Sequence, residues 1–462
     1  MKKHNIFKVV CIAILIAVLL TWIVPSSYYY GGVIDNGKAQ MGIFDLFSYL
    51  GSIVSYFGYV PLYILAVGGF YGVLYKTNGY RNLLNKLVDK YEGSEWIFLT
   101  IVMILFAVVT SVSGLSLGLF FLFPFVITTI LLMGYSKITA LLTTVGSVCI
   151  GLIGTSYSLT EMAVVNEYLG LSAASELIVK LVILVVGLIL LIVNTLLYAR
   201  KHRINSPRKG FKYPETTNEK AKTWPITFVF DAVLVVMILS FVSWNDAFEI
   251  TFFDELLNNI NEIKIGELAI FSKLLGGVAS FGNWTLTELS VLVVIASGFV
   301  ALLGKVSFND MVKGFGQGAR KALKPAFIAT IVYIFIFIAA YHPYTITIMD
   351  PIMTLTESFN VVTTAITSLI SHIFNVEMYY SASNTLGYIT SVITDTSVYG
   401  VVGVIWQATY GLAMLFVPTS VILVASLAYL NVSYGKWLKA IWKLLLQLIV
   451  ALLVIFLIIA MI

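Results

Sequence analysis

Long apolar runs separated by short polar segments make up most of the chain. Runs of about 20 residues are long enough to cross the hydrocarbon core of a bilayer as helices. The alternation of apolar and polar positions that is typical of an outer-membrane barrel does not occur. The pattern predicts helical spans at residues 9–24, 59–75, 96–112, 115–133, 138–153, 181–198, 226–244, 289–303 and 326–341, then an interrupted region, and a last helix at 444–462.

Four further segments mix polar and apolar residues at roughly helical spacing. Such segments are typical of amphipathic helices that lie in the membrane interface. The expected interfacial helices are residues 43–57, 80–91, 247–268 and 308–323. Together the elements predict an all-α polytopic membrane protein with about 10 to 12 transmembrane helices.

Composition supports the same class, because 59% of the residues are hydrophobic and only 11% are charged, whereas soluble domains carry about 25% charged residues. The two cysteines, Cys11 and Cys149, both lie in apolar runs and form no disulfide framework or metal pattern. No Walker motif or Ser/His/Asp set with credible spacing occurs, so we expect neither an enzyme nor an ATP-driven pump. The net charge of +5 does not imply nucleic acid; membrane lipid and a small-molecule substrate are the expected partners.

Lysine and arginine gather in four loops, within residues 76–90, 200–222, 305–324 and 436–443. Under the positive-inside rule these loops and the N-terminus are cytoplasmic, and the base-poor segment 245–283 is external. The last helix then ends outside the cell. The expected location is a bacterial-type cytoplasmic (inner) membrane.

The basic, proline-containing segment 200–225 is the expected linker between two transmembrane repeats, residues 1–199 and 226–462. The halves resemble each other weakly: residues 69–76 (GFYGVLYK) match 298–305 (GFVALLGK), and Leu122-Phe123-Pro124 matches 415–418 (LFVP). Corresponding breaks in two halves indicate a transporter site at the repeat interface.

The second-half break is the long interrupted region 375–434. Helix-breaking residues persist in hydrocarbon only where protein or a water-filled cavity satisfies the backbone. We therefore expect broken helices around a polar solute. A hydrated surface loop with one proline kink is the alternative. The expected substrate-binding residues here are Ser381, Ser383, Asn384, Thr385, Gln407, Thr409, Pro418 and Thr419.

The first-half counterpart lies in residues 110–118 and 151–158, where hydroxyls and glycines separate apolar runs. Helix N-termini at hairpin tips present unpaired N–H groups and a partial positive charge, which suit a carboxylate. Close helix packing on small residues is the alternative. The expected binding residues are Ser111, Ser113, Gly114, Thr155 and Ser156.

Ionisable residues inside a membrane are candidates for function. Asp395, at the end of the segment that begins near Ser383, is the expected ion-coupling residue. Asp231 is the other acid near a predicted span, and Glu161 is expected in an external loop.

The segments 416–420 (FVPTS) and 431–439 (NVSYGKWLK) resemble the C-terminal signature of the YfcC-type basic amino acid antiporter family, as do 21–25 (TWIVP) and 68–73 (GGFYGV) elsewhere. That family belongs with the anaerobic dicarboxylate carriers in the ion transporter superfamily. The resemblance implies two repeats with re-entrant hairpins, a scaffold domain, often a homodimer, and secondary transport of amino acids or carboxylates. It also implies a carboxylate and sodium site at a hairpin tip formed by Ser383, Asn384 and Thr385.

The chain departs from the family at 114–118 (GLSLG) and 407–411 (QATYG), where family members carry acidic residues. A desolvated cation needs a nearby anion, so we expect small amino acids or carboxylates rather than arginine or ornithine. The predicted function is their secondary transport by ion symport or solute exchange. Alternatives are an arginine/ornithine-type antiporter, and a sodium/proton antiporter or channel. No cofactor is expected beyond a coupling sodium ion or proton.

Overall fold

The computed structural model describes residues 5–30, 33–37, 39–204, 221–356 and 358–461. Most of the predicted linker, residues 205–220, lies outside this described part. The first half comprises α1 (Ile6–Ile23), β1 (Ser26–Tyr30), β2 (Val33–Gly37), α2 (Ile43–Phe57), α3 (Tyr59–Leu74), α4 (Asn78–Lys90), α5 (Glu95–Ser113), η1 (Leu117–Phe121), α6 (Phe123–Leu132), α7 (Lys137–Leu141), η2 (Leu142–Gly146), α8 (Ser147–Ile153), α9 (Leu159–Leu169) and α10 (Leu177–Lys201).

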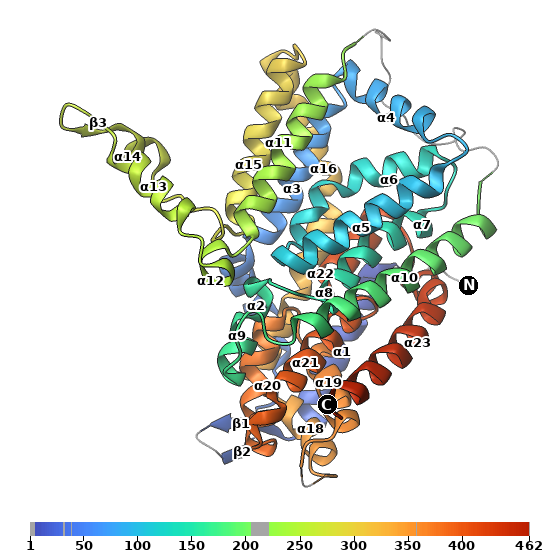
Figure 1. Cartoon of the computed structure of the whole chain (residues 1–462), viewed down its shortest axis with the longest axis vertical. Helices are drawn as coiled ribbons and strands as arrows, with labels where there is room; N and C mark the ends of the chain where they lie inside the picture. Colours follow the sequence, from blue (N-terminus) through green and yellow to red (C-terminus); the bar gives the residue numbers. More distant parts are fainter. Residues whose placement is uncertain (1–4, 31–32, 38, 205–220, 357, 462) are drawn as a thin grey trace.

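The second half comprises α11 (Trp224–Phe241), α12 (Trp244–Phe248), α13 (Phe252–Glu262), β3 (Lys264–Ile265), β4 (Leu268–Ala269), α14 (Ile270–Leu275), α15 (Leu286–Leu303), α16 (Phe308–Val332), α17 (Ile334–Tyr341), α18 (Thr345–Met353), α19 (Val361–Ile373), α20 (Met378–Val392), η3 (Thr396–Val398), α21 (Tyr399–Met414), α22 (Val421–Leu430) and α23 (Tyr434–Ile459). The strands form two antiparallel pairs, β1 with β2 and β3 with β4. The segment from α12 to α14 is an arm that projects from the body of the molecule (Figure 1).

Within the described residues, seven helices are long and apolar enough to cross a membrane. The pair α2 and α3, bent by 65°, would make an eighth span. The helices α6, α19 and α22 and the run from α7 to α8 are apolar but shorter. The prediction of an all-helical polytopic membrane protein is confirmed, and several of the expected spans are short or broken helices.

The span predicted at 115–133 is not one helix. It divides into η1 and α6, and Pro124 lies in the first turn of α6. Proline has no N–H and its ring obstructs the preceding turn, so it marks a helix start. Tyr63 and Tyr71 of α3 donate hydrogen bonds to two carbonyl oxygens of η1. The backbone groups that the break leaves free are thus bonded inside the protein.

The interfacial helix predicted at 308–323 is instead the first part of α16, which runs for 25 residues. Its residues Gly314 and Gly318 pack directly on glycines of α3, where a Cβ atom added at Gly318 would lie 2.8 Å from the Cα atom of Gly72. Only residues without a side chain allow two helix backbones to approach so closely. This face is therefore buried against protein. As a result α3 of the first half lies beside α15 and α16 of the second (Figure 1).

Candidate solute-binding site

A cavity of about 420 Å³ lies where broken helices from the two halves meet. The first half lines it with the segment between α5 and η1 and with α9. The second half lines it with residues at the starts of α15, α20 and α22. The volume is within the usual range for small-molecule sites. Broken helices around a cavity between halves are the arrangement in which transporters hold their solutes.

The start of α22 is the part of the cavity wall best suited to an anion. Ser420 is the N-cap residue, but its side chain accepts no capping hydrogen bond. The hydroxyl is fully buried, lines the cavity and has no hydrogen-bond partner. The first N–H groups of a helix also lack intrahelical partners and carry a partial positive charge. This helix end therefore offers unused donors to a carboxylate.

The break before α22 is stabilised by side chains that donate hydrogen bonds to backbone carbonyl groups. Trp437 donates from its indole nitrogen to the carbonyl oxygen of Leu415, 2.9 Å away, and the Tyr434 hydroxyl donates to that of Phe416. Pro418 lies in the turn, and the Thr419 hydroxyl donates to the carbonyl oxygen of Ile373 at 3.2 Å. The break is a fixed feature because its exposed backbone groups are satisfied.

The first-half break follows the same principle. Gly114 ends α5 with a φ of 70°, a conformation that favours glycine, and it lines the cavity. The Ser111 hydroxyl donates to the carbonyl oxygen of Gly154 at 2.6 Å and lies 3.1 Å from the Ser156 hydroxyl. These bonds tie the end of α5 to the segment after α8.

Most of the other predicted site residues also satisfy backbone groups near the breaks rather than line the cavity. Ser113 donates to the carbonyl oxygen of Val109 within α5. Thr155 donates to that of Leu152, and Gln407 donates from its amide to that of Ile153, the last residue of α8, at 3.3 Å. Thr409 bonds carbonyl groups of its own helix, α21. Among all the predicted binding residues, Gly114 is the one that lines this cavity.

The hairpin tip expected at Ser383, Asn384 and Thr385 is wrong in position, because the three residues lie within the continuous helix α20. Polar residues in a buried helix can bond one another and the preceding turn, so they do not require a break. Ser383 is exposed and donates to the carbonyl oxygen of Tyr379. The Asn384 amide lies 3.4 Å from the side-chain oxygen of Asn375. The actual break is the segment 374–377 before α20.

Ser381 and Thr385 belong to a buried polar network between α19 and α20. The hydroxyl of Ser371 lies 2.7 Å from the hydroxyls of both residues. Ser381 also lies 2.8 Å from Nδ1 of His372, whose other ring nitrogen is 3.0 Å from the carbonyl oxygen of Trp406. The network joins α19, α20 and α21 and consists of mutually bonded groups. The sodium site expected at residues 383–385 stays an untested prediction.

Asp395 lies away from the cavity and is exposed. It caps η3, where its carboxylate accepts hydrogen bonds from the N–H and hydroxyl groups of Ser397. These two bonds hold the pKa of Asp395 below its usual range. Its expected part in ion coupling stays a prediction.

Two acids that line the cavity were not among the predicted site residues, Glu161 and Glu377. Glu161 lies in the first turn of α9, where its N–H donates to the Ser158 hydroxyl. The spacing Ser-x-x-Glu is a capping-box signal that could have placed Glu161 at a helix start behind the break. Glu377 is the N-cap residue of α20 and accepts a hydrogen bond of 2.6 Å from the Tyr333 hydroxyl. No comparable sequence signal marks Glu377.

The family to which the chain belongs is decided by a match along its length. The family model described as C4-dicarboxylate anaerobic carrier, DcuC, matches residues 4–462. The chain belongs to this carrier family. It is also 21% identical over 399 residues to "Putative basic amino acid antiporter YfcC" of Escherichia coli (strain K12), covering 82% of this chain and 73% of that protein. The resemblance noted in the sequence is thereby confirmed, and the chain is a multi-pass membrane transporter.

Two solved transporters align with nearly the whole chain, although loosely. The YdaH transporter of Alcanivorax borkumensis is 14% identical with a TM-score of 0.43, and the alignment covers 98% of this chain and 97% of that one. MtrF of Neisseria gonorrhoeae is 12% identical with a TM-score of 0.39, and the coverage is 98% and 95%.

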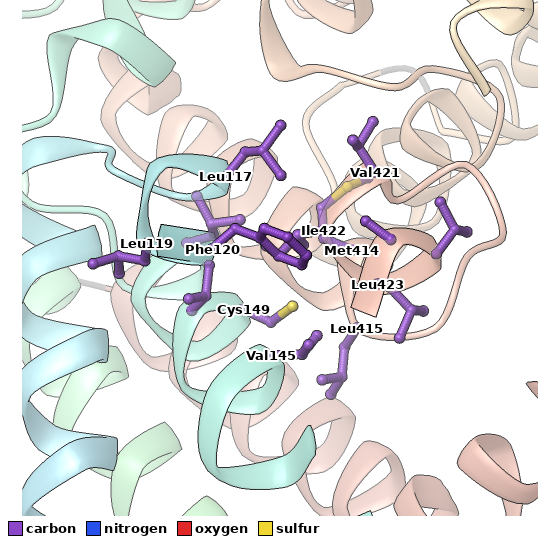
Figure 2. Packing of buried hydrophobic residues seen from close by; sticks show 14 of the residues in the cluster. Leu117, Leu119, Phe120, Val145, Cys149, Met414, Leu415, Val421, Ile422 and Leu423 are labelled. Atoms are coloured by element: carbon purple, nitrogen blue, oxygen red, sulfur yellow. The ribbon is translucent and has the colours of Figure 1, made fainter. Parts of the chain in front are cut away.

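Apolar packing closes the carrier's cavity on one side. Figure 2 shows side chains from η1, α8, the end of α21 and the start of α22 gathered around Phe120. Leu117, Met414, Val421 and Ile422 belong to this group and also line the cavity. Apolar walls lower the local dielectric constant and so strengthen every electrostatic interaction inside.

Proposed function

We propose that the chain is a secondary active transporter that moves small amino acids or carboxylates across the cytoplasmic membrane by ion symport or solute exchange. The observation that carries this proposal is the start of α22, where the unpartnered Ser420 hydroxyl and the free helix N–H groups adjoin the central cavity. A solute carboxylate placed there would receive charge-assisted hydrogen bonds.

Charge on the cavity wall bears on the solute class. Glu161 and Glu377 line the cavity, and no lysine, arginine or histidine is among its lining residues in the described part of the chain. A dicarboxylate would meet two further carboxyl groups there. An amino acid brings one carboxylate and one ammonium group, so its net charge adds nothing to the repulsion. Small amino acids are therefore the first candidates.

C4-dicarboxylates are the second candidates, because the family model carries that description. They would need accompanying cations to enter this cavity. Arginine and ornithine are the third, supported by the description of the relative YfcC. The sequence argument against them was the loss of acids at residues 114–118 and 407–411. That ground no longer holds, because Glu161 and Glu377 supply carboxyl groups from other segments.

The test is a solute panel on purified protein. Thermal unfolding midpoints are measured with alanine, serine and glutamine, with succinate and fumarate, and with arginine and ornithine. Solutes that stabilise the protein are then assayed by counterflow in proteoliposomes. We expect neutral amino acids to stabilise the protein and to exchange. If no amino acid or carboxylate stabilises the protein or exchanges, the proposal is wrong.

A further inference from the structure

Glu161 and Glu377 come from different halves of the chain and reach the same cavity. They are carried by α9 and α20, which pack against each other, and both lie at helix starts that border the cavity. Both residues line the same cavity of about 420 Å³, so the charge of each carboxyl group acts on the other across a partly apolar space. Two like charges in an apolar cavity repel each other and lose their hydration, so the pair needs a positive charge.

A protein cation does not supply that charge within the part of the chain that the structure describes, where neither glutamate forms an ion pair. The titratable groups that face the pair are tyrosines, namely Tyr59 of α3, Tyr333 between α16 and α17, Tyr379 and Tyr380 of α20, and Tyr410 of α21. Tyr333 donates its hydrogen to Glu377. A phenol can donate a hydrogen bond to a carboxylate but cannot neutralise it.

Ser420 is an independent sign that a ligand belongs in this cavity. Its hydroxyl is fully buried and lines the cavity, yet it has no hydrogen-bond partner. Because the Ser420 hydroxyl both lines the cavity and lacks a partner in the protein, it is free to bond a ligand held there. A hydroxyl has lone pairs as well as a hydrogen, so it can face a cation and a carboxylate together. Oxygen atoms from two carboxylates and a hydroxyl are the ligands that hard cations prefer.

We propose that Glu161 and Glu377 form the coupling-ion site of the transporter and together hold one monovalent cation, a sodium ion or a proton. The role of this site in coupling rests on the function proposed above, whereas the cation site itself does not. The bound cation lies on the same cavity as the anion-accepting start of α22. Each ligand therefore raises the affinity for the other, and this reciprocal coupling links the solute to an ion gradient.

The first experiment measures cation binding without any solute. Thermal unfolding midpoints of purified wild-type protein and of Glu161→Gln, Glu377→Gln and Glu377→Asp are recorded in sodium chloride against choline chloride, and at pH 6 against pH 8. Glu167→Gln is the matched control, because Glu167 lies exposed on the same helix α9. Stabilisation by sodium at constant pH indicates a sodium site, and stabilisation at low pH without sodium indicates a proton site.

We expect wild type, Glu167→Gln and Glu377→Asp to respond to the cation, because all three keep a carboxyl group at each position of the pair. The two glutamine variants should need roughly tenfold more cation, or more, because a charged ligand is lost. An unresponsive wild type, or a glutamine variant that responds like Glu167→Gln, overturns the inference. If one glutamine variant does not fold, the cation response of the other is compared with those of Glu377→Asp and wild type, and the same outcomes support or overturn the inference.

The second experiment separates ion coupling from solute binding in proteoliposomes. We expect the glutamine variants to lose accumulation driven by a sodium or proton gradient, whereas counterflow should persist but need more solute, because the coupled cation no longer raises solute affinity. Loss of counterflow together with an unchanged cation response would assign the pair to the solute's ammonium group and overturn the inference. A wild type without counterflow that still shows the cation response contradicts the proposed function and leaves the cation site standing.

Discussion

The hydroxyl of Thr419 donates to the carbonyl oxygen of Ile373 across 3.2 Å and so joins the two second-half breaks that border the cavity. Ile373 is the last residue of α19, and Thr419 precedes α22 by two positions. Gln407 makes the corresponding bond to Ile153 at the end of α8. Polar residues of the interrupted segments thus hold the helix ends in place, and the cavity lies between the ends they hold.

Removing the bond from Thr419 should loosen this arrangement. Thr419→Val keeps the side-chain shape and leaves the carbonyl oxygen of Ile373 without this partner. We expect a loss of about 0.5–1.5 kcal/mol of unfolding free energy and weaker solute binding. Thr390→Val is the control, because Thr390 bonds carbonyl groups of its own helix. Equal stability and affinity in the two variants, measured by thermal unfolding with and without solute, would show that the bond contributes neither to stability nor to solute binding.

The glycine contact between α3 and α16 gives a second test. Gly318→Ala places a Cβ atom against the backbone of Gly72, and overpacking of this kind costs about 1–3 kcal/mol. Gly316 lies two residues away on the same helix, and a Cβ atom there meets nothing within 4 Å. Gly316→Ala should be neutral or stabilise α16 by up to about 1 kcal/mol, because alanine favours helix. Unfolding midpoints in detergent that fall equally in both variants would contradict the packing described here.

Apolar periodicity was enough to predict the class of fold and most of the long helices. It could not show which polar residues share a cavity, because that depends on how helices cross. The mixed polar and apolar residues of 308–323 predicted an interfacial helix, but Gly314 and Gly318 in that segment pack against α3. The cluster at residues 383–385 indicated a break, yet its side chains bond within and beside α20. The breaks themselves were marked correctly by Gly114 and Pro418, whose backbone chemistry acts locally.

The two acids that line the cavity could not be paired from the sequence. Glu161 is about 220 residues from Glu377 in the chain, and neither lies in a long apolar run. Hydropathy therefore assigned Glu161 to a loop. Only the packing of α9 on α20 brings the two residues to one cavity. Local pattern cannot report a pairing of this kind.

Orientation in the membrane is a third prediction, based on the distribution of lysine and arginine. A single cysteine at Asn258, exposed on α13, should react with an impermeant thiol reagent in intact cells. A single cysteine at Gly435, exposed at the start of α23, should react only after permeabilisation. Both are introduced after Cys11 and Cys149 are replaced. The reverse pattern of labelling would invert the assigned topology.

The last prediction concerns the hydroxyl of Ser420. Ser420→Ala removes a buried group that has no partner in the protein, so the unfolding free energy without solute should not fall. Ser426→Ala is a close control, because Ser426 is also buried and unpartnered on α22 but does not line the cavity. The two variants should therefore be equally stable when no solute is present.

Solute should separate these two variants. If the Ser420 hydroxyl donates to a solute carboxylate, its loss removes a hydrogen bond to a charged group, worth about 1.5–3 kcal/mol. That corresponds to a loss of affinity of roughly 10- to 150-fold. Ser426→Ala should bind like wild type. Affinity is read from the dependence of the unfolding midpoint on solute concentration. Equal affinity in the two variants would place the solute carboxylate elsewhere, whereas a loss confined to Ser420→Ala would locate it at the start of α22.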